Sequence, residues 1–115
     1  MPREDGLPPG TLLLLILRIL SVEPLHGYAI AQRIAVLSSG ALSVEEGSLY
    51  PALQKLLVNG WAKSTPAVSE TGRTVRVYRL TPSGRRQLNA EEEKYQRMSS
   101  AIAAILRTPD MGIDR

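Results

Sequence analysis

The 115-residue sequence predicts a mainly α-helical fold with a small β-hairpin and a long C-terminal helix. Apolar residues recur with helical spacing in successive segments of the chain. Two short runs that alternate like strands then flank a polar link, and the last helical segment is the longest. A chain of this length buries about two-thirds of its unfolded surface, so one core can form without covalent or metal cross-links.

The first helix is predicted to run from Thr11 to about Val22, with Thr11 as a candidate N-cap. Because this segment is apolar all round, we expect it to be buried on more than one side, within the domain or partly against a second chain. Residues 1–10 contain three prolines and two glycines, which predicts an irregular N-terminal arm.

A second helix is predicted to start near Gly27, after the break at Glu23-Pro24, and to stop before residues 38–40. Its apolar residues recur with helical spacing: Tyr28, Ile30, Ala31, Ile34 and Leu37. His26 comes directly before this helix, and we expect it to be a structural loop residue rather than a ligand or a base. Residues 41–44 are predicted to form a short extended link.

The third helix is predicted from Glu45 or Glu46 to Asn59, with Gly60 at the C-terminal cap position. Its buried stripe consists of leucines: Leu49, Leu53, Leu56 and Leu57. Pro51 lacks a backbone donor and clashes with the preceding turn of a helix. We therefore expect Pro51 to lie near the start of this helix.

Residues 61–68 and 74–80 are predicted to form a hairpin whose tip is the polar link at residues 69–73. The second run has the period of a two-sided ribbon, which predicts Arg76 and Arg79 on opposite faces. A hairpin alone is marginally stable, so it should pack against the helices. We expect Trp61 to be a core or interface residue, with a platform for stacking an effector as the alternative.

Thr81-Pro82 is a strong helix start, an N-cap followed by proline at the first helical position. The helix is predicted to run to Leu106 or Arg107, and its apolar residues follow a heptad pattern that only Glu91 breaks. The members of this stripe are Leu88, Tyr95, Met98, Ile102 and Ile105. The stripe predicts a partner helix, most simply from a second copy of the chain. The alternative is a helix folded back on its own domain.

Composition argues against an enzyme. The sequence has no cysteine and a single histidine, so it lacks thiolate ligands and nucleophiles and has one candidate imidazole base. Nothing in it supplies a paired acid and base or a phosphate-binding glycine loop. We therefore expect no catalytic site, no cofactor and no metal ion.

The apolar run at residues 12–20 is shorter than the roughly 20 residues that span a bilayer. Glu4 and Asp5 lie where a signal peptide is basic, and Arg18 interrupts the apolar run. We therefore expect no membrane segment and a cytoplasmic protein.

The net charge of +3 is unevenly distributed. Between Gln54 and Asn89 there are seven basic residues and one acidic residue, Glu70, whereas the rest of the chain has seven basic and ten acidic residues. A basic segment within a nearly balanced chain indicates a surface for a polyanion, although a solvated face is the alternative.

The order helix, helix, link, helix, hairpin is that of a winged helix-turn-helix. We therefore divide the chain into the arm, a DNA-binding domain at residues 11–80, a dimerisation helix at residues 81–107 and a tail at residues 108–115. In this fold one helix enters the major groove and the basic hairpin meets phosphates. The candidate DNA-binding residues of the hairpin are Arg73, Thr74 and Arg76. Two further arginines, Arg85 and Arg86, are equally expected to contact flanking DNA or to be solvated.

Four motifs carry a resemblance to a known family: HGYAI at residues 26–30, GSLYPAL at 47–53, GW at 60–61 and YRLTPSG at 78–84. In this order they resemble the signatures of PadR-family transcriptional regulators, and the length is similar to that of the short subgroup with one C-terminal dimerisation helix. The resemblance implies a homodimeric winged-helix repressor that binds a palindromic double-stranded DNA operator. It also implies release from DNA by a small molecule or a stress signal.

By the same resemblance the Tyr50-Pro51 block opens the recognition helix, and the residues expected to face DNA are Ser48, Tyr50, Gln54 and Lys55. Tyr50 has two open roles, donating to a phosphate or packing against the first helix. Glu45 and Glu46 depart from the family pattern, because carboxylates favour a helix N-terminus but repel phosphate. The alternative function is a winged-helix module that binds a protein partner without DNA.

Overall fold

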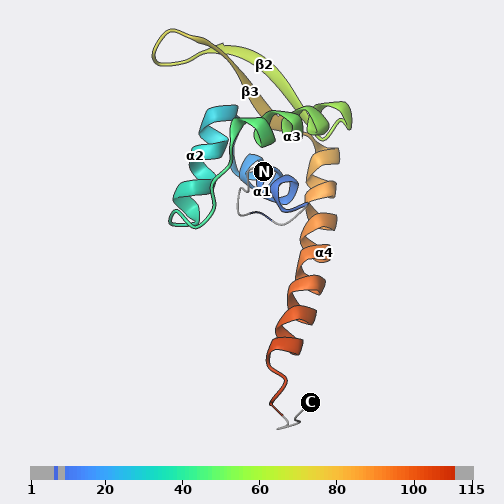
Figure 1. Ribbon diagram of the computed structural model, residues 1–115. Coiled ribbons are helices and arrows are strands. Elements are labelled where there is room, and N and C mark those ends of the chain that lie inside the picture. The colour runs from blue at the N-terminus through green and yellow to red at the C-terminus, as the bar shows by residue number, and fades with distance from the viewer. Residues whose placement is uncertain (1–6, 8–9, 111–115) are drawn as a thin grey trace.

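The computed structural model describes Leu7 and residues 10–110. Within these residues the chain forms four helices and three strands. Figure 1 labels the four helices and the two longer strands. Their order is α1 (Thr11–Val22), β1 (Leu25–His26), α2 (Gly27–Leu37), α3 (Glu46–Val58), β2 (Ala62–Val68), β3 (Thr74–Leu80) and α4 (Pro82–Leu106). The predicted fold class, a winged helix-turn-helix with a long C-terminal helix, is confirmed. Most of the predicted arm and the end of the predicted tail lie outside the described residues.

Helix α1 lies at the centre of the molecule and contacts α2, α3, α4 and β3. Its buried residues are Ile16, Leu17, Ile19 and Leu20. The expectation that an all-apolar helix is buried on more than one side is therefore confirmed. Each of these side chains contributes about 1.5–3 kcal/mol through its burial, so α1 supplies a large part of the core stability.

Helices α1, α2 and α4 begin at three different types of N-cap residue. The N-cap of α1 is Gly10 in the left-handed region (φ 82°), so Thr11 is the first helical residue and its prediction as N-cap was wrong. Glycine takes this backbone conformation without the steric cost that threonine would meet. Thr81 caps α4 as predicted, because its hydroxyl accepts from the Gly84 amide at 3.0 Å. His26 caps α2, with Nδ1 accepting from the Ala29 amide at 3.3 Å.

The three strands form an antiparallel sheet in the order β1-β3-β2. The hairpin register pairs Val68 with Thr74 and Ala62 with Leu80, so β2 and β3 match the predicted runs except that Trp61 lies before the strand. We call β2, β3 and residues 69–73 the wing. Strand β1 was not predicted, because two residues show no alternation. Pro66 is tolerated because β2 is an edge strand, where a missing amide donor leaves no ladder bond unmade.

Helix α3 ends as predicted, with Asn59 as C-cap and Gly60 beyond it in the left-handed region (φ 74°). Proline costs no helical hydrogen bond in the first turn of a helix, but Pro51 lies in the second turn of α3. The backbone therefore lacks one helical bond, the one that an amide at residue 51 would donate to the Gly47 carbonyl. The core packing of the leucine stripe of α3 holds the helix together through this break.

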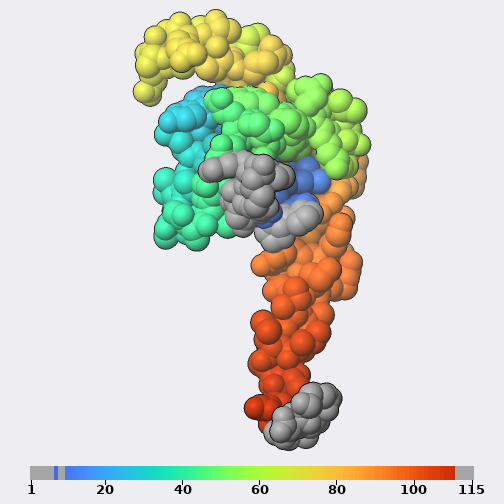
Figure 2. Space-filling view, viewed as in Figure 1, coloured from blue at the N-terminus to red at the C-terminus, as the bar shows by residue number. Residues whose placement is uncertain are grey.

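The molecule is elongated, with principal extents of 64 × 32 × 25 Å. Figure 2 shows the wing protruding at one end, above α3, and α4 extending from the body at the other end. The first turns of α4 pack on α1, and Leu88 belongs to the core. Among the described residues, no helix is both long enough and apolar enough to cross a membrane.

Candidate nucleic-acid interface

Helix α3 buries one side and presents the other to solvent. The leucines Leu49, Leu53 and Leu56 face the core, and the opposite side exposes Tyr50, Gln54 and Lys55. Ser48 is half-buried at the first turn. The helical period explains this division, since residues three and four apart share a face. Three of the four candidate residues of α3 are therefore available to a ligand, and Ser48 is available in part.

Tyr50 packs against the start of α2. A β-carbon on residue 27 would lie 3.0 Å from both Cε1 and the hydroxyl oxygen of Tyr50. Glycine at this position therefore lets the tyrosine ring approach the α2 backbone. The ring remains 45% exposed, so its hydroxyl is open to a partner. The tyrosine can therefore pack through its ring and still offer its hydroxyl to a partner.

Tyr78 links α3 to the wing. It is buried at the base of β3, and this burial raises the pKa of its phenol above the ordinary value of 10.0. The nearby Tyr50 raises this pKa further, while the positive charge of Arg76 opposes the shift. Tyr50 of α3 and Arg76 of the wing therefore both lie within electrostatic range of one phenol. Helix α3 also packs on β2, so α3 and the wing adjoin.

Two of the candidate DNA-binding residues of the wing, Thr74 and Arg76, lie on the same face of β3 as Tyr78. Thr74, Arg76 and Tyr78 alternate with residues of the opposite face, and Arg79 is on the opposite face as predicted. Arg73 ends the link at the wing tip and is exposed. The Arg76 guanidinium donates to the Ser64 hydroxyl through Nε at 3.0 Å, and to the Ser64 carbonyl at 3.4 Å. Ser64 was not among the candidate residues that the sequence predicts. The one signal for its contact with Arg76 is the hairpin register, which makes the two residues diagonal neighbours.

The junction between α3, the wing and α4 is tightly packed. The Thr81 hydroxyl donates to the Gly60 carbonyl at 2.6 Å, and the Thr81 amide donates to the Trp61 carbonyl at 3.0 Å. A β-carbon on residue 84 would overlap the Trp61 carbonyl oxygen. Gly84 is therefore required for α4 to start at this distance. The three elements therefore meet through close contacts to the backbone at residues 60 and 61.

The basic residues near this surface keep their charge available. Within the described part of the chain, Lys55, Lys63 and Arg73 have no acidic side chain at ion-pair distance, whereas Arg33 is paired with Glu23 at 3.1 Å. Glu46 is exposed in the first turn of α3, where its carboxylate lowers the local positive potential. The positive surface is therefore centred on the wing and on the middle of α3 rather than on the first turn of α3.

The second half of α4 exposes most of its apolar stripe. Tyr95, Met98, Ile102 and Ile105 are between 49% and 72% exposed, whereas Leu88 is 3% exposed and packs in the core of its own chain. Leu88 was expected at a dimer interface. It lies elsewhere because the first turns of α4 cover α1, which leaves the stripe available only from Tyr95 onward.

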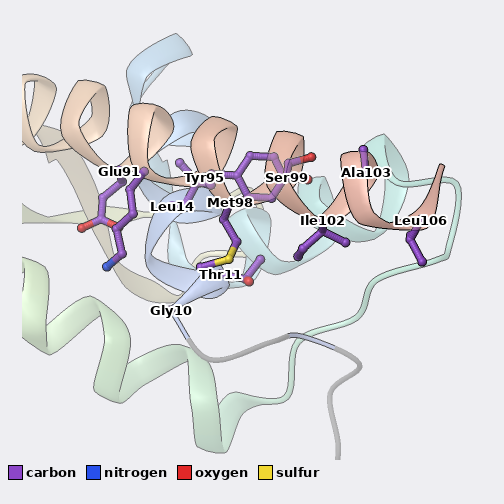
Figure 3. Close-up of a pocket in the computed structure, with 11 residues that line it drawn as sticks. Gly10, Thr11, Leu14, Glu91, Tyr95, Met98, Ser99, Ile102, Ala103 and Leu106 are labelled. Atoms are coloured by element: carbon purple, nitrogen blue, oxygen red, sulfur yellow. The ribbon is translucent and has the colours of Figure 1, made fainter. Parts of the chain in front are cut away.

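A groove of about 610 Å³ lies between this exposed stripe and the start of α1. In Figure 3, Met98 extends from α4 toward Gly10 and Thr11, and Tyr95 lies beside Leu14. Ile102 and Leu106 line its far part, and Glu91 lies at one end. The groove is therefore mainly apolar, with charged groups at its border.

Among the described residues, no group of three or more histidine, cysteine, aspartate or glutamate side chains is arranged to hold a metal ion. The charged groups of the candidate surface are mainly arginine and lysine, and such groups bind phosphates rather than cations.

Comparisons with known proteins agree with this geometry. Residues 16–90 match the sequence profile described as "Transcriptional regulator PadR-like family". The matched range extends from α1 through α2, α3 and the wing to the first turns of α4. The chain has no significant match among curated proteins.

Several solved structures are similar over nearly the whole chain. A transcriptional regulator from Clostridium thermocellum has a TM-score of 0.78 and 26% identity, over 85% of this chain and 95% of that one. A PadR-like transcriptional regulator from Bacillus cereus has a TM-score of 0.74 and 26% identity, over 87% and 95% of the two chains. A PadR-family regulator from Eggerthella lenta has a TM-score of 0.74 and 28% identity, over 87% and 85%.

Proposed function

Since the chain belongs to the PadR-like family of transcriptional regulators, we propose that it acts as a homodimer that binds double-stranded DNA through α3 and the wing. The observation that carries this proposal is that α3 packs on β2, so that exposed basic side chains of α3 (Lys55) and of the wing (Arg73 and Arg76) are carried by two adjoining elements. The family consists of regulators and not of enzymes, so the bound nucleic acid is a target and not a substrate.

The dimensions of α3 suit the major groove. The helix has 13 residues, which corresponds to about 20 Å at 1.5 Å per residue. The groove is about 12 Å wide and admits one helix, whose exposed side then faces the base edges. In this placement Gln54 and Lys55 reach the bases or the flanking phosphates, and the Tyr50 hydroxyl donates to a phosphate. Arg73, Thr74 and Arg76 of the wing contact the adjacent backbone.

The exposed stripe of α4 supports the homodimer. Four large apolar side chains along one helix face leave a surface that favours association with a second apolar face. A second copy supplies the same face, and the two-fold symmetry that results requires a palindromic target. Leu88 takes no part in this interface, because it is buried within its own chain.

The proposal includes repression that a small molecule or a stress signal relieves. The groove between α1 and α4 supports the first of these signals, since it is apolar and large enough for a small organic effector. Tyr95, Met98 and Ile102 line both this groove and the proposed dimer face, so the effector would bind beside the partner helix. An effector bound there would contact α4, and α4 is joined to α3 and the wing at the Thr81 junction. The proposal includes a cytoplasmic location, where a regulator of this kind would meet its DNA target.

Selection from a random-sequence duplex library by the purified protein tests this function. We expect recovery of a palindrome whose half-sites are about one helical turn apart or a multiple of that distance. Recovery of a single non-repeated site would contradict the symmetric dimer.

The alternative function, a module that binds a protein partner, is favoured by Glu45 and Glu46 at the start of α3, where they would repel phosphate. This alternative predicts no retardation of any duplex at low salt. Binding of duplexes that weakens steeply with salt would exclude it.

A further inference from the structure

Ser64 holds the side chain of Arg76 in one orientation. The two residues lie diagonally opposite on the same face of the wing, and the guanidinium donates to both the hydroxyl and the carbonyl of Ser64. We propose that Ser64 is a positioning residue, which fixes the Arg76 guanidinium for contact with a DNA phosphate. This inference rests on the proposed function, in which the wing binds DNA.

The backbone of the edge strand explains why Ser64 can make both contacts. Residues of β2 alternate between bonding to β3 and pointing their backbone groups to the open edge. Pro66 has no amide donor and takes an edge-pointing position, and Ser64, two residues away, has the same orientation. Its carbonyl is therefore free for Arg76, whose side chain crosses β2 to reach it.

The chemistry of Ser64 orients the guanidinium without neutralising it. An acidic partner, such as Glu23 for Arg33, pairs with the positive charge and reduces its attraction for phosphate. A hydroxyl and a carbonyl are uncharged acceptors. They occupy two of the five N–H donors of Arg76 and leave three, including those of the terminal fork, for a phosphate.

The expected gain comes from conformational entropy. Ordering a flexible side chain at an interface costs about 0.5–1.5 kcal/mol, which corresponds to about two- to tenfold in affinity. If Ser64 orders Arg76 before binding, much of this cost is absent when the phosphate is bound. In a dimer with two wings the factor is squared, so removal of the Ser64 hydroxyl should weaken binding by about four- to one-hundredfold.

The test compares Ser64→Ala, Ser64→Thr, Arg76→Ala and the double variant Ser64→Ala/Arg76→Ala, with a palindromic duplex from the selection and a random-sequence duplex of equal length as probes. Thr65→Ala is the matched control, since it removes a hydroxyl from the next residue on the opposite face. We expect Ser64→Ala to weaken binding of both duplexes and Ser64→Thr, which retains a hydroxyl, to restore it.

Two further readouts separate positioning from direct contact. Ser64→Ala should leave the slope of log affinity against log salt unchanged, whereas Arg76→Ala should reduce it by about 0.9 for each phosphate that is no longer neutralised. In the Arg76→Ala background, Ser64→Ala should have no additional effect. An unchanged affinity for Ser64→Ala, a changed slope, or the same decrease in both backgrounds would each overturn the proposal.

Measurement of the free protein distinguishes a failure of this inference from a failure of the proposed function. The Arg76 Nε–H group should show restricted motion in NMR relaxation experiments, and Ser64→Ala should release it. If the group is restrained but the wild-type protein retards neither duplex, the proposed function is wrong, and the role of Ser64 in DNA binding fails with it. If the wild type binds DNA and Arg76 is equally mobile with and without Ser64, only the positioning role is wrong.

Discussion

The ring of Tyr50 lies against the backbone of Gly27, which joins the exposed side of α3 to the first residue of α2. This contact makes the aromatic ring structural, while the hydroxyl remains accessible. Tyr50→Phe should therefore leave the free energy of unfolding nearly unchanged and weaken DNA binding by about 1.5–3 kcal/mol for each hydrogen bond to a phosphate that is removed. Tyr50→Ala should lower both the free energy of unfolding and the affinity for DNA. Chemical denaturation and DNA titration of the two variants measure these effects, and an unchanged affinity for Tyr50→Phe would leave the residue with a packing role alone.

Arg73 at the tip of the wing should contribute a phosphate contact that carries no sequence information. Arg73→Ala is expected to weaken binding of specific and random duplexes alike, because phosphates are the same in every sequence. The slope of log affinity against log salt should fall by about 0.9 for each protomer. Arg79→Ala is the matched control, since Arg79 lies at the base of the wing, far along β3 from the tip. Equal slopes for Arg73→Ala and the wild type would remove Arg73 from the interface.

The exposed stripe of α4 should form the dimer. Ile102→Asp replaces an apolar side chain in both copies, and without its burial the dimer is less stable by about 3 kcal/mol or more in total, which weakens it by at least about a hundredfold. Light scattering should then show a monomer that binds a half-site weakly. Ser100→Asp, on the outer side of α4, should remain a dimer. A dimeric Ile102→Asp protein would place the interface elsewhere, and α1 would then be the next helix to examine.

Gly84 should be intolerant of any side chain. A β-carbon there meets the Trp61 carbonyl, so Gly84→Ala requires α4 to shift and should lower the free energy of unfolding by about 1–3 kcal/mol. Gly47→Ala is the matched control in α3, because a β-carbon at residue 47 has no neighbour within 4 Å among the described residues. Alanine there should stabilise the helix by about 0.5–1 kcal/mol. Thermal or urea unfolding of the two variants should therefore give changes of opposite sign.

Tyr78 should make the stability depend on alkaline pH. In the unfolded chain its phenol loses the proton near the ordinary pKa of 10.0, whereas burial raises the pKa in the folded protein. Below about pH 10 both states keep the proton, and this contribution to stability is complete. As pH rises from about 10 through the raised pKa, the unfolded state binds fewer protons, so the free energy of unfolding falls.

Tyr78→Phe should flatten this alkaline decrease while leaving the stability near pH 7 similar. Tyr28→Phe, at an exposed residue of α2, serves as the control and should leave the decrease in place. Urea unfolding between pH 8 and the alkaline limit measures the two profiles. The same decrease in Tyr78→Phe as in the wild type would show that another group causes it.

The elements of the fold could be predicted because each has a strong local signal. The leucine spacing of α3, the alternation in β3 and the Thr81-Pro82 start of α4 determine those elements within one or two residues. Strand β1 could not be predicted, since two residues carry no period and their pairing with β3 depends on the tertiary fold. The cap of α1 was missed for a related reason, because the left-handed conformation of Gly10 is not evident from composition.

The candidate site could be predicted in its residue types but not in its contacts. Periodicity indicates that Tyr50 is exposed, but it gives no information on the Gly27 backbone beneath the ring. The heptad pattern groups Leu88 with Ile102, because sequence spacing does not show where α4 leaves the body. The contact between Ser64 and Arg76 depends on the hairpin register together with the rotamer of a long side chain. Only the register can be obtained from the strand boundaries.

The edge of the wing has a consequence for the behaviour of the protein in a concentrated solution. An exposed hairpin with an open strand edge is a template for edge-to-edge pairing with other chains, which leads to aggregation. Pro66 removes a donor from the middle of this edge, and the Arg76 side chain covers the carbonyl of Ser64. The wing can therefore project far from the core without pairing at its edge, so that it stays available for DNA at high protein concentration.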